Sequence, residues 1–144
     1  MADSTEALYT GTALSTGGGR DGHVATDDRR IDLEVRPPKE MGGSGEGTNP
    51  EQLVAAGWAA CFNGALQAIM RKEGVKVDTP PEVRVQSTIN RDGEGFSISA
   101  AIAVTFHGVE QDVADDLVAK AHEFCPYSKA TRGNVPTEVT ATVA

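Results

Sequence analysis

The sequence is poor in cysteine and carries no excess of positive charge. Its 144 residues include two cysteines, and the formal net charge is −8 at pH 7. Two cysteines do not make the disulfide framework of a small secreted protein. Acidic and basic residues are interspersed, which argues against a nucleic-acid-binding surface and against an anionic membrane partner. A small or neutral ligand suits this charge better.

Targeting signals and long uninterrupted apolar runs are also lacking. The N-terminal residues Met1 to Glu6 form neither a basic nor an apolar segment, so we expect no secretory signal. Asn63 interrupts the longest apolar stretch, which disfavours a membrane span. With 39% apolar residues, the chain has enough material for one core. The sequence therefore predicts a single domain over residues 1–144 in a soluble, cytoplasmic protein.

One long helix dominates the pattern. Pro50 suits the first helical position and Asn49 the N-cap, while Gly74 is a good residue to follow the end, so the helix should span roughly 24 residues. Almost every residue in it is apolar or small, which is typical of a helix buried on all sides. On the side of the helix that carries Cys61, small residues leave room for another segment to approach the sulfur; these are Gly57, Gly64 and Ala68. Bulkier residues form a second side, namely Val54, Trp58, Phe62, Ala65 and Ile69.

Alternating apolar and polar residues predict strands and a second helix. The strands are expected at residues 8–14, 23–26, 31–35, 83–89, 96–106 and 138–143, the helix at 111–124, a flexible turn at 15–22, a glycine-rich loop at 39–47, and a short turn or helix at 127–133. This order indicates an α+β fold with antiparallel hairpins. Strands this modest cannot cover the long apolar helix on all sides, so we expect a homodimer with a shared core.

Several motifs lack the context that their chemistry needs. The glycine pattern at residues 17–22 matches a dinucleotide fingerprint, but a strand follows it where a helix is required, so it is interpreted as a turn. No Gly-x-Ser-x-Gly elbow supports hydrolase chemistry. His122 and Cys125 are three residues apart and Cys61 could add a third ligand, but a structural zinc site usually needs four. No metal site is predicted.

Both cysteines and Glu51 have purely structural interpretations. A free cysteine in an alanine-rich buried helix behaves as a compact apolar residue, and position alone favours this for Cys61. Cys125, just before Pro126 at a helix end, should be less buried and able to move toward another sulfur. Glu51 in a first helical turn is favoured by the helix dipole, although it could also clamp an arginine. Arg20, in a turn, needs no special explanation.

Four motifs occur in order along nearly the whole chain: Gly-Gly-Arg-Asp-Gly at 18–22, Gly-Thr-Asn-Pro-Glu-Gln-Leu at 47–53, Ala-Ala-Gly-Trp-Ala-Ala-Cys-Phe at 55–62 and Cys-Pro-Tyr-Ser-Lys-Ala-Thr-Arg-Gly-Asn at 125–134. Together they resemble the organic hydroperoxide resistance proteins of the OsmC-like superfamily. Trp58 stands where the family pattern has tyrosine, and Lys129 where it has asparagine. Both departures lie at supporting positions and leave the expected reaction unchanged.

The resemblance implies an OsmC-like fold, with antiparallel strands around a long central helix, and an intertwined homodimer with active sites at its interface. It implies a thiol peroxidase that reduces alkyl or fatty-acid hydroperoxides to alcohols. Cys61 would be the peroxidatic cysteine and Cys125 the resolving cysteine, with Arg20 and Glu51 tuning Cys61. No cofactor or metal is implied, and the expected reductant is the dithiol of a lipoylated protein.

Apolar side chains near Cys61 could form a pocket for the organic part of the peroxide, and the candidates are Trp58, Phe62 and the loop residue Met41. Two alternatives stay open. The osmotically inducible branch of the superfamily shares the two-cysteine chemistry but usually lacks the Gly-Gly-Arg-Asp-Gly and Cys-Pro-Tyr-Ser forms. A non-catalytic thiol redox sensor, or an apolar-ligand binder switched by a disulfide, would use the same cysteines.

Overall fold

The computed structural model describes residues 4–144. The chain divides into two compact units, the first ending at Pro50 and the second running from Glu51 to Ala144. The single domain expected over residues 1–144 stays a prediction. The two units differ in composition, because strands and glycine-rich loops make up the first while the long apolar helix belongs almost wholly to the second.

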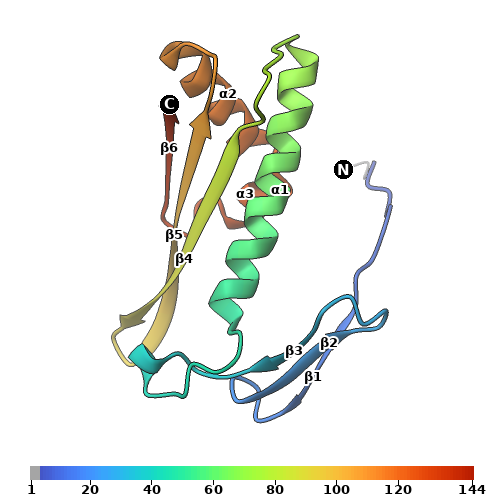
Figure 1. The fold of residues 1–144 in the computed structure, drawn as a ribbon. Helices are drawn as coiled ribbons and strands as arrows, with labels where there is room; N and C mark the ends of the chain where they lie inside the picture. Colours follow the sequence, from blue (N-terminus) through green and yellow to red (C-terminus); the bar gives the residue numbers. More distant parts are fainter. Residues whose placement is uncertain (1–3) are drawn as a thin grey trace. The chain divides into compact units, whose positions relative to one another are not determined.

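The first unit is a three-stranded antiparallel sheet in the order β1-β2-β3, drawn in blue in Figure 1. Its elements are β1 (Ala13–Gly17), β2 (Gly22–Thr26), β3 (Asp32–Val35) and a short 3-10 helix, η1 (Lys39–Met41). A loop follows η1, and Thr48 in it forms an isolated parallel bridge with Val35. This bridge attaches the end of the glycine-rich loop to β3.

The first strand begins later than its pattern predicted. Leu8 and Tyr9 lie outside any strand and are exposed, and residues 15–17, the first part of the flexible turn predicted at 15–22, are instead paired with β2. The chain reverses within a tighter turn, because Gly17 and Gly19 adopt positive φ angles of 76° and 73° that other residues disfavour. This turn carries Arg20.

The second unit packs helices on a three-stranded sheet in the order β4-β5-β6. Its elements are α1 (Pro50–Lys72), β4 (Glu82–Asp92), β5 (Gly95–Phe106), α2 (Gln111–Phe124), α3 (Pro126–Thr131) and β6 (Thr137–Val143). The α+β class is confirmed, and β4 and β5 form the predicted antiparallel hairpin. The expectation of antiparallel strands is wrong for β6, which pairs parallel to β5, because α2 and α3 return the chain to the middle of β5, where Thr137 pairs with Ala100.

The limits of the helices follow local signals in the sequence. α1 begins at Pro50 as predicted. At its other end Gly74 has a φ of 68°, Val75 N–H donates to the Met70 carbonyl at 2.9 Å, and Gly74 N–H donates to that of Arg71 at 3.3 Å. These two bonds form a Schellman motif. α2 has its predicted limits, since Pro126 cannot continue it.

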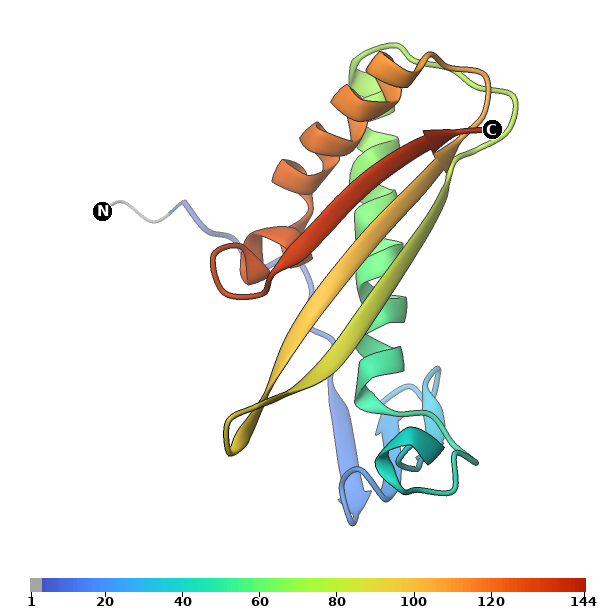
Figure 2. The same cartoon turned by 90° about the vertical axis from the view of Figure 1, so that its left-hand side faces the viewer.

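The core of the second unit lies between the sheet and α1 and α2, which cover one of its faces (Figures 1 and 2). The bulky side of α1 is buried as predicted, and it meets alternate residues of β5 and one side of α2: Trp58, Phe62, Ala65, Leu66, Ile69 and Met70 pack with Ala100, Ile102, Val104, Phe106, Ala114, Leu117, Val118 and Ala121.

The opposite side of α1 is not covered by residues 4–144. Ala56, Ala60 and Gly64 are exposed there. A single chain therefore leaves part of α1 uncovered, as the sequence predicted, because the sheet and α2 cover only part of its circumference. Burial of the remaining side by a second chain stays a prediction.

By length and composition alone, α1 is long and apolar enough to cross a membrane. The core helix of a folded protein meets the same criterion, and six residues of α1 belong to the core of the second unit. This is weak evidence for a membrane span. The cytoplasmic location stays a prediction.

Candidate functional site

The second unit brings the two cysteines together. The thiol of Cys125 donates to Cys61 with 3.5 Å between the two Sγ atoms, and both cysteines are free. A disulfide has an S–S distance of about 2.05 Å, so a movement of about 1.5 Å would join them. The two cysteines are 64 residues apart in the sequence, and they come together because α1 packs against the junction of α2 and α3.

Burial of the two thiols is the reverse of the sequence-based expectation. Cys125 is fully buried, with 0% exposure, whereas Cys61 is partly exposed. The reason is that the junction holding Cys125 packs into the core, while Cys61 lies on α1 beside the uncovered small residues. The exposed partner is thus the thiol predicted to meet a peroxide.

Helix termination fixes the backbone of Cys125. This residue follows α2 and precedes Pro126 at the start of α3, with an extended conformation of φ −63° and ψ 124°. Its N–H donates to the Ala121 carbonyl at 2.8 Å, and its own carbonyl accepts from Lys129 N–H at 2.9 Å. Both neighbouring helices therefore hold the thiol-bearing residue.

The surroundings of Cys61 favour its neutral form. Burial raises the pKa of the Cys61 thiol, and the adjacent Cys125 raises it further, while a hydrogen bond from the backbone N–H of Tyr127 lowers it. The net direction is upward. Since only the thiolate is an efficient nucleophile, the thiol pair needs a nearby cation to become reactive.

Arg20 and Glu51 belong to different compact units. Arg20 is exposed in the turn between β1 and β2, and Glu51 is partly buried in the first turn of α1. The structure places each on the predicted element. Their pairing with each other, and their approach to Cys61, stay predictions.

Arg36 braces the turn that carries Arg20, a role that no pattern in the sequence indicates. Its Nη1 donates to the carbonyls of Gly22 at 2.8 Å and Val35 at 2.6 Å, and its guanidinium pairs with Glu34 at 3.0 Å and Asp21 at 3.5 Å. The side chain links the end of β3 to the β2 side of the β1–β2 turn.

Trp58 and Ser128 form a second contact between α1 and α3. The indole Nε1 donates to the Ser128 hydroxyl at 3.3 Å. Close by, the Tyr127 hydroxyl lies against Gly57, where an added Cβ would come within 3.0 Å of it. Sequence reasoning overlooked Ser128 and Tyr127, although the Cys-Pro-Tyr-Ser motif contains both.

The residues predicted to line a substrate pocket differ in how much of each side chain is exposed. Trp58 and Phe62 are core side chains, with exposures of 1% and 0%, whereas Met41 is 42% exposed in the first unit. Burial of the two rings disfavours direct contact with a substrate in this conformation. The pocket stays a prediction.

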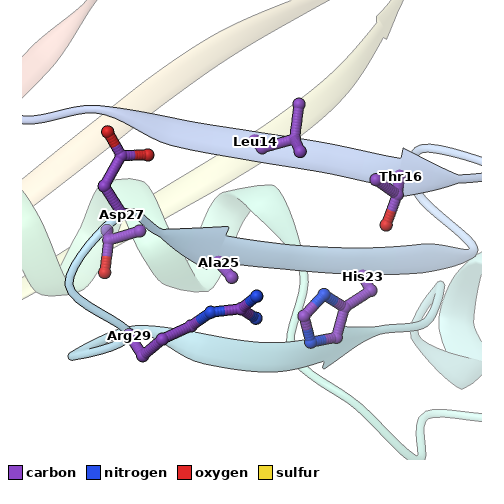
Figure 3. A pocket seen from close by; sticks show the side chains of 7 residues that line it. Leu14, Thr16, His23, Ala25, Asp27 and Arg29 are labelled. Atoms are coloured by element: carbon purple, nitrogen blue, oxygen red, sulfur yellow. The ribbon is translucent and has the colours of Figure 1, made fainter.

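A separate cavity of about 320 Å³ lies on the sheet of the first unit (Figure 3). His23 and Arg29 extend over the same stretch of this sheet, and both contact Asp32, at 2.6 Å and 3.5 Å. The cavity is lined by Leu14, Thr16, His23, Ala25, Thr26, Asp27 and Arg29. None of these is a predicted site residue.

Within residues 4–144, no group of three or more His, Cys, Asp or Glu side chains is placed to hold a metal ion. The ring of His122 packs against Phe62, with 6.5 Å between ring centroids. Burial, followed by the charge of Arg132, lowers the pKa of His122. The imidazole is therefore a neutral neighbour of the core.

Comparison with known proteins places the chain in a family. Residues 43–140 match the family model described as OsmC-like protein. The chain belongs to the OsmC-like family. It is 43% identical over 147 residues to the organic hydroperoxide resistance protein of Xanthomonas axonopodis pv. citri (strain 306), with all of both chains covered.

Solved structures agree with this membership of the OsmC-like family. An organic hydroperoxide resistance protein from Legionella pneumophila is 40% identical, with a TM-score of 0.90 over 96% of this chain and 100% of that one. A protein described as a putative organic hydroperoxide resistance protein, from Vibrio cholerae and with captopril bound in one active site, is 39% identical, with a TM-score of 0.88 over 98% and 96%. The expected OsmC-like fold and the resemblance to the organic hydroperoxide resistance proteins are confirmed.

Proposed function

We propose that this protein is a cysteine-based peroxidase that reduces organic hydroperoxides to alcohols. The observation that carries the proposal is the pair of free thiols 3.5 Å apart, one partly exposed and one buried beneath it. An inert core cysteine would not require a second sulfur at this distance. Relatives named for organic hydroperoxide resistance support the choice of substrate.

The first step oxidises Cys61. Its thiolate attacks the peroxide oxygen remote from the organic group, the O–O bond breaks, and the organic oxygen leaves as an alkoxide that takes up a proton to become the alcohol. Cys61 becomes a sulfenic acid, having lost two electrons to the peroxide. Arg20 stabilises the thiolate and the developing alkoxide charge, and Glu51 holds Arg20 by a bidentate ion pair.

The second step joins the two sulfurs. The Cys125 thiol gives up its proton and attacks the sulfenic sulfur, an S–S bond forms, and the hydroxyl group leaves as water. The disulfide protects Cys61 from irreversible further oxidation. A dithiol then reopens it by exchange, becoming a cyclic disulfide itself. We assign this step to a dihydrolipoyl group of a lipoylated protein, acting as a co-substrate, with no bound cofactor or metal.

A second copy of the chain would cover the small side of α1. Ala56, Ala60 and Gly64 are exposed beside partly buried Cys61, and small side chains permit close approach of another backbone. We therefore include an intertwined homodimer in the proposal. Analytical ultracentrifugation should give twice the chain mass, and a monomer at micromolar concentration would remove this part of the proposal.

Peroxide consumption with dihydrolipoamide tests the function. The wild type should turn over repeatedly with cumene hydroperoxide and more slowly with hydrogen peroxide. Cys61→Ser should abolish turnover, and Cys125→Ser should reduce one equivalent and then overoxidise. Retained turnover in Cys61→Ser contradicts the mechanism. A single oxidation of the wild type that the dithiol cannot reverse would favour the redox-sensor alternative.

A further inference from the structure

Two side-chain contacts join α1 to the segment that follows α2. Trp58 donates to Ser128 at 3.3 Å, and Cys125 donates to Cys61 at 3.5 Å. Trp58 precedes Cys61 by three residues, and Ser128 follows Cys125 by three. Residues three apart share a face of a helix. The two contacts are therefore neighbouring links between the same two segments, one turn apart.

The polar link is shielded from solvent. Trp58 is 1% exposed and Ser128 is 0% exposed. An indole N–H and a hydroxyl in such a place lose a large part of their solvation, and each satisfies the other only while α3 stays against α1. Separation of the segments would leave both groups unpaired in the core. The bond therefore favours one distance between α1 and α3.

We propose that the Trp58–Ser128 hydrogen bond positions Cys125 for its attack on Cys61, an inference that rests on the proposed function. Trp58 and Ser128 are positioning residues, because they act through the backbone of residues 125–128. With the segment held, the sulfurs need to close only from 3.5 Å to about 2.05 Å. A reacting group held this near has a high effective concentration.

The Trp58–Ser128 bond should affect mainly the rate of resolution, the second of the two chemical steps. Oxidation of Cys61 breaks the peroxide O–O bond and does not involve Cys125. Resolution forms the Cys61–Cys125 bond and releases water, so it depends on where α3 holds the second sulfur. Loss of the Trp58–Ser128 bond should slow resolution far more than the first oxidation, to which this segment contributes a backbone hydrogen bond from Tyr127 to Cys61, whereas general damage to the fold would slow both steps alike.

The experiment compares Ser128→Ala, Trp58→Phe and the double variant, each with and without Cys125→Ser. Trapping of the sulfenic acid with dimedone in the Cys125→Ser background gives the rate of the first step. In the variants that keep Cys125, loss of the second free thiol after one equivalent of cumene hydroperoxide gives the rate of the second step. We expect resolution to slow about tenfold in each single variant, with the first step changed far less in Ser128→Ala. The double variant should resolve as slowly as the singles, although it leaves no buried polar group unpaired and so regains stability.

The reduction potential of the cysteine pair gives a readout that needs no peroxide. A tenfold loss in effective concentration should raise the potential by about 30 mV in a dithiol redox buffer. Ser87→Ala is a matched control, because the buried Ser87 hydroxyl in β4 has no hydrogen-bond partner among the described residues. It should change neither rate nor potential.

Wild-type resolution rates and potentials in both single variants would overturn the inference. Equal slowing of the two chemical steps would also overturn it. If the wild type forms the disulfide in redox buffer but consumes no peroxide, the proposed function fails. In that case the potential of Ser128→Ala still decides whether the hydrogen bond positions Cys125.

Discussion

The two compact units of this chain differ in how much of themselves they bury. Among the described residues of the first unit, the buried apolar side chains are Ala25 and Val35, and β1 is exposed along its whole length. In the second unit, α1, α2 and β5 share a continuous core that includes Cys125. The thiol pair is thus built on rigid elements, whereas the arginine proposed to activate it lies on a glycine-rich turn.

The two units differ in whether their apolar side chains are buried within the unit. The second unit brings its two sulfurs together with its own core. The first unit has apolar side chains that remain exposed, among them Leu14, Ile31 and Leu33, and covering such side chains would further stabilise a small sheet. This agrees with the homodimer proposed above, in which a second chain adds buried surface.

The largest expected effect is on the stability of the second unit. Phe106 in β5 has no exposed surface, so Phe106→Ala should lower the free energy of unfolding by about 3–5 kcal/mol. Phe96→Ala in the same strand is a matched control, because Phe96 is 60% exposed. Urea denaturation measures both. Similar losses for the two variants would contradict the assignment of the core.

A substitution in the first unit should instead change reactivity. Arg20→Ala is expected to slow oxidation of Cys61 about a hundredfold at pH 7, because a neighbouring opposite charge lowers a pKa by about 1–3 units. Arg20 is exposed, so the urea midpoint should hardly move. Stopped-flow mixing with cumene hydroperoxide gives the rate, and the exposed Arg30→Ala is the control. Equal rates for Arg20→Ala and Arg30→Ala would remove Arg20 from the mechanism.

The same variant should shift the pH dependence. Burial raises the pKa of Cys61 in the structure, and Arg20→Ala removes the charge proposed to counteract this, so the oxidation rate of the variant should keep rising above the ordinary thiol pKa of about 8.5. The wild-type rate should level off at lower pH, since its thiolate forms earlier. Superimposable pH profiles would show that Arg20 does not tune this thiol.

A smaller effect is expected where the first unit braces its own turn. Arg36→Ala removes the bonds to the Gly22 and Val35 carbonyls, while the chain keeps the Arg20 side chain itself. The oxidation rate should fall about fivefold, the equivalent of one hydrogen bond worth about 1 kcal/mol. Arg20→Ala with Arg36→Ala should be no slower than Arg20→Ala alone. Additive losses would mean that Arg36 acts independently of Arg20.

The sequence predicted helices better than it predicted how strands pair. Pro50 and Pro126 mark a helix start and a helix end that the structure confirms, and periodicity grouped the bulky residues of α1 on one side, which the structure buries. Alternation shows which face of a strand is buried but not the direction of its neighbour. For this reason the parallel pairing of β6 was missed. The late start of β1 was missed because the apolar residues Leu8 and Tyr9 favoured an earlier strand, whereas the structure leaves both exposed and outside any strand.

The sequence predicted the two cysteines of the candidate site but not the packing around them. Motif resemblance selected Cys61 and Cys125, and the structure brings their sulfurs together. Burial of Cys125 was not foreseen, because position at a helix end does not reveal what packs against that end. The Trp58–Ser128 bond spans 70 residues and depends on tertiary packing. No local pattern contains that information.

The central claim is that Cys61 and Cys125 form a redox-active pair that is oxidised by an organic hydroperoxide. Its most direct test is peptide mass mapping of the wild type after one equivalent of cumene hydroperoxide, with the alcohol product quantified in the same sample. The account predicts a Cys61–Cys125 disulfide-linked peptide in an amount equal to the alcohol formed. Alcohol formed while both cysteines remain free thiols, or a peroxide left unconsumed, would contradict it.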